Sequence, residues 1–124
     1  MNSEQFQPAS ILQKAYNALK DAIPIIERLP KSQKFTLGDR LQNLLSEILE
    51  MLIEAHYSAK IEKLPLLQKV NIKLEKLRFF TRLCFDLGYL SARQYEDFVR
   101  RHDEIGRMAG GWIKSLLPRP PIGT

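Results

Sequence analysis

Apolar residues recur three and four positions apart along most of the chain, and polar or charged residues fill the positions between them. This spacing is the period of an amphipathic helix, whereas a half-buried strand would alternate. Proline, glycine and capping residues divide the pattern into four segments, at about 10–29, 36–60, 65–87 and 91–117. The sequence therefore predicts an all-α protein whose four helices bury their apolar stripes against one another.

Residues at the expected helix ends support this division. Leu29-Pro30 closes the first helix, because the residue before a proline is driven out of the helical conformation. Thr36 and Asp39 form a capping-box-like pair at the start of the second helix. Pro65 suits the first turn of the third helix, where its missing N–H costs nothing.

The fourth helix begins with a capping box, Ser91 with Gln94, and Gly88 suits the end of the third. The connections are short, which is typical of an antiparallel up-down-up-down four-helix bundle. We interpret residues 1–124 as one domain of this kind. The stretch up to Pro8 and the proline-rich tail 118–124 are expected to be loose.

The third helix carries two apolar rows. The row predicted to face the core has 3-4-3-4-3 spacing and consists of Leu67, Val70, Leu74, Leu77, Thr81 and Cys84. Ile72, Phe79 and Leu83 lie about 170–200° around the helix from it. Single surface hydrophobes are normal, so a wide stripe is the simpler alternative. The alignment of three large ones favours an interface between copies of the chain.

Charge is concentrated on the same helix. The chain has 19 basic and 14 acidic residues, a net charge of +5, and residues 63–87 hold much of the excess. Five of these basic residues are candidates for nucleic-acid binding: Lys69, Lys73, Lys76, Arg78 and Arg82. Only Glu75 and Asp86 are available as partners within the helix, so we expect most of this charge to be unneutralised. Such a field attracts polyanions, although it also suits a solvated face or an acidic protein partner.

The fourth helix has basic residues at every seventh position: Arg93, Arg100, Arg107 and Lys114. Three acid-first pairs four residues apart are expected to neutralise most of this ridge: Glu96–Arg100, Asp97–Arg101 and Asp103–Arg107. Gly106 and Gly110 interrupt the helix at a cost of about 1 kcal/mol each relative to alanine. Their spacing predicts a tight helix–helix contact.

Residues for catalysis or metal binding are not evident. Cys84 lies in the apolar row and is expected to be a buried, reduced thiol. Neither His56 nor His102 has a carboxylate or cysteine at a spacing that suggests a metal site, and we expect His102 to be partly buried with its hydrogen bonds satisfied. No arginine precedes either histidine at the spacing of small helical RNases. We therefore expect no enzyme activity, metal or cofactor, and, without an apolar run of membrane-spanning length, a cytoplasmic protein.

Three segments of the chain resemble the accessory variability determinants, four-helix proteins of diversity-generating retroelements: 77–82, 90–95 and 107–113. The segment 31–39 resembles a sister family encoded by intervening sequences in 23S ribosomal RNA genes, but residues 52–57 depart from that family. The first resemblance implies a ring-shaped homo-oligomer, a pentamer, with a positively charged surface. It also implies association with a reverse transcriptase and with template RNA or cDNA.

Arg78, Arg82 and Arg107 stand where the resembled family has arginines, and Trp112 stands where it has a tryptophan, which we expect to pack. We therefore predict a non-enzymatic accessory protein that binds nucleic acid through Arg93 and Arg107 as well as the five basic residues of the third helix. Two alternatives stay open at this point. One is a homo-oligomeric structural protein that binds no nucleic acid, and the other is a protein of the ribosomal intervening-sequence type.

Overall fold

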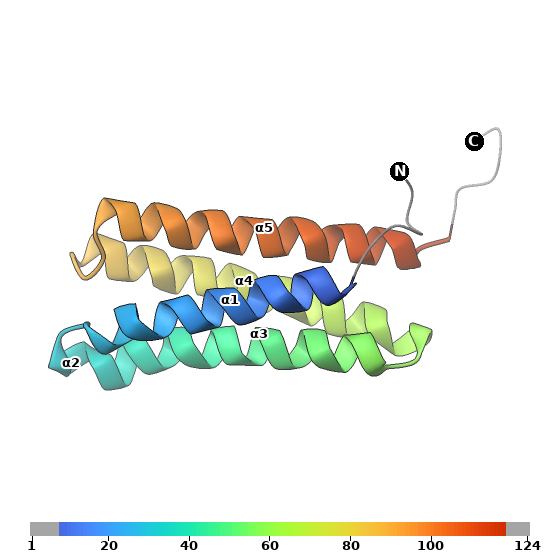
Figure 1. The fold of residues 1–124 in the computed structure, drawn as a ribbon, viewed down its shortest axis with the longest axis horizontal. Coiled ribbons are helices and arrows are strands. Elements are labelled where there is room, and N and C mark those ends of the chain that lie inside the picture. The colour runs from blue at the N-terminus through green and yellow to red at the C-terminus, as the bar shows by residue number, and fades with distance from the viewer. Residues whose placement is uncertain (1–7, 119–124) are drawn as a thin grey trace.

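The computed structural model describes residues 8–118, and the regular structure in this range is entirely helical. Four long helices lie side by side (Figure 1): α1 (Pro8–Glu27), α3 (Asp39–Tyr57), α4 (Lys60–Asp86) and α5 (Ala92–Leu116). Two short elements, α2 (Lys31–Gln33) and the π-helical turn η2 (Lys34–Gly38), connect α1 to α3. The all-α prediction is confirmed. The ends that we expected to be loose lie outside the described residues, apart from Pro8 and Pro118.

Each long helix contributes a stripe to one shared core. Helix α3 packs against α1 and α4, and α5 packs against the same two helices. The six core residues predicted on α4 are all buried, which confirms the first apolar row. Burial raises the pKa of the Cys84 thiol, as expected for a reduced cysteine in an apolar setting. No helix within residues 8–118 is both long and apolar enough to cross a membrane.

The connection between α1 and α3 differs from the prediction. The chain becomes helical again at Lys31, directly after Pro30, so Thr36 lies inside a helical run and caps nothing. Its hydroxyl donates backwards to the Gln33 carbonyl oxygen at 3.2 Å, which is the usual habit of a threonine within a helix. Gly38 is buried against α1, since a β-carbon there would lie 3.0 Å from Ile26.

The start of α4 is also earlier than predicted. The helix begins at Lys60, five residues before Pro65, so the proline lies inside it and removes one backbone donor. Lys63 fixes this first turn against α3, because its Nζ donates to the carbonyl oxygens of Ala55 at 2.7 Å and His56 at 3.0 Å. Those carbonyls belong to the last turn of α3, where a cation is favourable.

The turn between α4 and α5 follows the prediction. Gly88 has a φ of 81°, a left-handed conformation that glycine adopts without strain, and the Tyr89 N–H donates to the Cys84 carbonyl at 2.9 Å. The capping box of α5 is present in full: the Gln94 N–H donates to Ser91 Oγ, and the Ser91 N–H donates to Gln94 Oε1.

Candidate nucleic-acid interface

An exposed apolar row runs along the outer side of α4. Ile72, Phe79 and Leu83 are 58%, 64% and 40% exposed, so the second apolar row is confirmed as a surface feature. Because α4 begins at Lys60, two more exposed residues, Ile61 and Pro65, belong to this row. At 100° of rotation per residue, all five side chains lie within an arc of about 40° around the helix axis. Sequence reasoning missed Ile61 because it started the helix at Pro65, and it treated Pro65 only as a first-turn residue. We call these five residues the α4 apolar row, and it is about 33 Å long at 1.5 Å per residue.

The basic residues of α4 lie on two flanks of this row rather than on one face. Lys73 reaches α3, where its Nζ lies 3.1 Å from Glu47 Oε1. Arg78 reaches the other way, and its Nε lies 3.4 Å from Asp103 Oδ1 of α5. By helical spacing Lys69 and Lys76 share the flank of Lys73, and Arg82 shares the flank of Arg78. The structure therefore does not bring the five predicted residues together.

Most of these cations have carboxylate partners, contrary to the prediction. In addition to the two pairs between helices, Arg78 Nη1 lies 3.0 Å from Glu75 Oε2, and Arg82 Nε lies 3.6 Å from Asp86 Oδ2. Among the described residues, no carboxylate lies within 4 Å of Lys69 or Lys76. The prediction was wrong because it counted partners within the helix, whereas α3 and α5 supply further ones.

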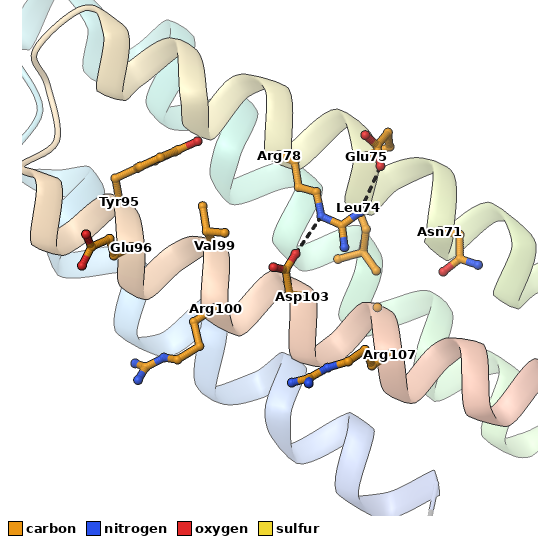
Figure 2. Close-up of a pocket in the computed structure, with 11 residues that line it drawn as sticks. Asn71, Leu74, Glu75, Arg78, Tyr95, Glu96, Val99, Arg100, Asp103 and Arg107 are labelled. Carbon is orange, nitrogen blue, oxygen red and sulfur yellow. Dashed lines mark hydrogen bonds and ion pairs between the residues drawn. The ribbon is translucent and has the colours of Figure 1, made fainter.

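Arg78 occupies a groove between α4 and α5. Figure 2 shows its guanidinium between Glu75 and Asp103, with Arg100 and Arg107 also lining the groove. A β-carbon on Gly106 would lie 2.8 Å from Arg78 Nη2, so this glycine makes room for the arginine side chain. A β-carbon on Gly110 would have no described atom within 4 Å of it beyond its chain neighbours and the backbone of α5 itself. Within residues 8–118 these glycines therefore make no tight helix–helix contact, because Gly106 meets a side chain and Gly110 meets open space.

The ion pairs of α5 also differ from the prediction. Only Asp97–Arg101 forms, with Arg101 Nε 3.0 Å from Asp97 Oδ2. Asp103 is held by Arg78, and Arg100 contacts Asp97 instead of Glu96. On its other side, α5 forms two ion pairs with α1. Glu104 pairs with Lys14 of α1 at 3.4 Å, and Arg101 pairs with Asp21 of α1 at 2.9 Å.

With these ion pairs formed, three cations on α5 have no carboxylate partner among the described residues. Arg93, Arg107 and Lys114 are exposed, and no carboxylate of the described residues lies within 4 Å of any of them. The free positive charge of the described structure therefore lies more on α5, and less on α4, than the sequence suggested. Exposed pairs contribute little to stability, but they do reduce the local field that a polyanion meets.

Two side chains with ring nitrogens, His102 and Trp112, are buried on the inner face of α5. His102 is 1% exposed, and neither ring nitrogen has a hydrogen-bond partner among the described residues, so the prediction of a satisfied, partly buried histidine is wrong. Burial, with Arg78 and Arg101 adding to it and Asp97 opposing, lowers the pKa of His102 to about 4. Trp112 is buried with Lys63 Nζ 5.9 Å from its ring, which confirms that it packs.

Comparisons with known proteins agree with this architecture. One solved structure is a protein of unknown function from the S23 ribosomal protein family of Bacteroides thetaiotaomicron. It has a TM-score of 0.80 and 16% identity, and the match covers 86% of this chain and 97% of the other, so it establishes the fold alone. No curated protein matches the chain. The family model described as bAvd-like, for the bacterial accessory variability determinants, matches residues 10–116. The chain therefore belongs to the bAvd-like family.

Proposed function

We propose that this protein is a non-enzymatic accessory protein of a diversity-generating retroelement. Its role is to hold the reverse transcriptase together with template RNA or cDNA in the cytoplasm. The family match over residues 10–116 carries this proposal. The exposed cations of α4 and α5 support it, because a protein that accompanies a polymerase on RNA needs unpaired positive charge on its surface.

Assembly is the first part of the proposal. The short connections support an antiparallel up-down-up-down bundle, and the α4 apolar row supports association of bundles into a ring-shaped homo-oligomer, a pentamer in keeping with the family. Fully burying one large apolar side chain contributes about 1.5–3 kcal/mol. Burial of Ile72, Phe79 and Leu83 together therefore contributes substantially to the free energy of association, whereas in a monomer all three side chains stay exposed to water.

Light scattering tests this assembly. The wild type should have several times the 14.4 kDa mass of one chain. Phe79→Glu places a charge in a contact that excludes water, so it should dissociate the oligomer. Tyr16→Glu is the matched control, because Tyr16 is also an exposed aromatic residue, at 50%. It lies on α1, which packs mainly against α3 and α5 rather than against α4. A monomeric wild type, or equal loss of mass in both variants, contradicts an interface at the α4 apolar row.

Nucleic-acid and polymerase binding are the second part. Lys69, Lys76, Arg93 and Arg107 supply unpaired charge, while Lys73, Arg78 and Arg82 must exchange carboxylates for phosphates to take part. The binding free energy should therefore depend steeply on salt. The test is a gel shift with template RNA across a salt series, together with co-purification of a diversity-generating retroelement reverse transcriptase. If neither RNA nor reverse transcriptase binds, the proposed function is refuted.

The likeness in fold to the S23 ribosomal protein family favours a second candidate, a protein of the 23S intervening-sequence type. Gene neighbourhood separates the two. A reverse transcriptase gene and an imperfect repeat pair beside this gene support the retroelement role, whereas a location inside a 23S ribosomal RNA gene supports the second candidate.

A further inference from the structure

A ridge of cations follows the outer side of α5. Its members stand seven residues apart, so they lie on one side of the helix at intervals of about 10 Å, over about 31 Å in total. We call this set the α5 basic ridge: Arg93, Arg100, Arg107 and Lys114. All four are exposed, and only Arg100 contacts a carboxylate of the described residues, that of Asp97. Of the carboxylates that sequence spacing assigned to the ridge, Asp103 is held by Arg78 of α4, Asp97 contacts Arg100 and Arg101, and Glu96 faces solvent.

A gap in the side-chain surface lies within this ridge. Gly110 and Gly111 stand between Arg107 and Lys114, three and four residues from each, so both adjoin the same stretch of the ridge. Each costs about 1 kcal/mol of helix stability relative to alanine. Apart from chain neighbours and the backbone of α5 itself, neither has a described atom within 4 Å of the position that a β-carbon would take, so packing within residues 8–118 does not require them. Helix backbone is therefore open to a close approach from outside.

The α5 basic ridge has cations that can contact phosphates, but it has no exposed aromatic rings on which bases could stack. Proteins that bind single strands stack the bases on aromatic rings, in addition to contacting phosphates. The aromatic residues of α5 are Tyr95, Phe98 and Trp112, and all three point inward or are at least half-buried. A straight row of cations without rings is instead suited to the phosphates of a double helix, which are read by shape rather than by sequence.

We propose that the α5 basic ridge binds the sugar-phosphate backbone of double-stranded RNA, with Gly110 and Gly111 allowing that backbone close to Arg107 and Lys114. This inference rests on the proposed function, since it assigns a surface and a class of RNA to its nucleic-acid binding. It moves the main contact from α4, where the sequence placed it, to α5. Coulomb attraction falls with distance, so the missing side chains at the glycine gap strengthen the contact.

Removing the negative charge of Glu96 gives an independent test, because it should strengthen RNA binding rather than weaken it. Glu96 is exposed at the edge of the groove beside Arg100, and no cation of the described residues lies within 4 Å of it. Its carboxylate opposes phosphate binding at the ridge. Glu96→Gln should therefore tighten RNA binding, whereas a ridge that makes no contact with RNA predicts no change.

The main experiment measures fluorescence anisotropy of a labelled 20-base-pair RNA duplex and of a labelled 20-nucleotide oligouridine across a salt series. The double variant Arg93→Gln/Arg107→Gln should weaken duplex binding at low salt and reduce the salt slope by about 1 for each lost contact. Lys69→Gln/Lys76→Gln is the matched comparison, because it also removes two unpaired, exposed cations, from α4. It should weaken duplex binding less than the α5 variant, since the ridge makes the main contact. Light scattering should show wild-type assembly for every variant that is compared.

A second variant separates binding from folding. Gly111→Leu fills open space and replaces glycine with a better helix former, so it should raise the melting temperature by a few degrees while weakening duplex binding several-fold. A variant that only disturbed the fold would lower both quantities.

The inference is overturned if the α4 variant loses as much affinity as the α5 variant, or if Gly111→Leu binds the duplex like the wild type. Oligouridine binding as tight as duplex binding overturns the assignment to double-stranded RNA. In each of these cases the wild type still binds RNA, so the proposed function stands. A wild type that binds neither probe overturns the inference, and it refutes the proposed function as well only if the reverse transcriptase also fails to co-purify.

Discussion

Replacing His102 with leucine should remove a large part of the acid sensitivity of this fold. The imidazole is buried between helices, stacks on Phe98 with ring centroids 5.9 Å apart, and leaves both nitrogens without a partner among the described residues. Burial is the main reason that a positive charge is disfavoured there; Arg78 of α4 and Arg101 of α5 add to it, and Asp97 opposes it. A charged His102 is therefore destabilising in the folded state, while an unfolded chain protonates it freely.

The size of the effect follows from the shift in pKa. The folded-state pKa of about 4 lies below the ordinary 6.5, so the unfolded chain binds the proton more tightly. Stability is thus full above pH 6.5 and falls as the pH is lowered towards 4. Linkage gives a loss of about 2 kcal/mol between pH 7 and pH 5, and of about 3 kcal/mol once His102 is fully protonated in both states. The window from pH 7 to pH 5 is the useful one, because most carboxylates do not titrate there.

Urea unfolding followed by circular dichroism at pH 7, 6 and 5 measures this loss. His102→Leu should flatten the pH dependence, and at pH 7 it should be as stable as the wild type or more so, because it removes two unpaired polar atoms. His56→Gln is the control for the loss of an imidazole, since His56 is only partly buried. If the wild type and His102→Leu lose the same free energy between pH 7 and pH 5, the reasoning about His102 is refuted.

Three further predictions concern contacts that only the structure reveals. Lys63→Met should lower the free energy of unfolding by about 1–2 kcal/mol, because it leaves two carbonyls at the end of α3 without their donor, whereas Lys60→Met should not; chemical denaturation of both checks this. Gly110→Ala should raise the free energy of unfolding by up to about 1 kcal/mol, since its β-carbon meets open space. Gly106→Ala should raise the free energy of unfolding less than Gly110→Ala does, or should lower it, because its β-carbon displaces the Arg78 side chain. Equal melting temperatures for the two variants would contradict the placement of Arg78 over Gly106.

Sequence alone determined which side of each helix is buried. The period of apolar residues decides that directly, so the core row of α4 and the burial of Cys84 and Trp112 were predictable. The capping box at Ser91 and the left-handed Gly88 were predictable as well, because both depend on residues a few positions apart. The exposed row of Ile72, Phe79 and Leu83 followed from the same helical periodicity.

Helix starts were harder, because they depend on neighbouring elements. Thr36 has the composition of a cap, yet the chain is already helical before it, and η2 presses Gly38 against α1. Pro65 looks like a first-turn residue, but Lys63 fixes an earlier turn of α4 onto the end of α3. In both places a contact between helices outweighs a local preference.

Only the tertiary structure decided where the free charge lies. Spacing along one helix paired Asp103 with Arg107, but Arg78 reaches across from α4, over Gly106, and takes that carboxylate. Lys73 likewise finds Glu47 on α3. Ion pairs form between whichever side chains meet at a helix–helix contact, and sequence spacing within one helix does not contain that information. The packing of the helices therefore shows which cations of α4 and α5 are paired, and this is the basis for proposing α5 as the main contact.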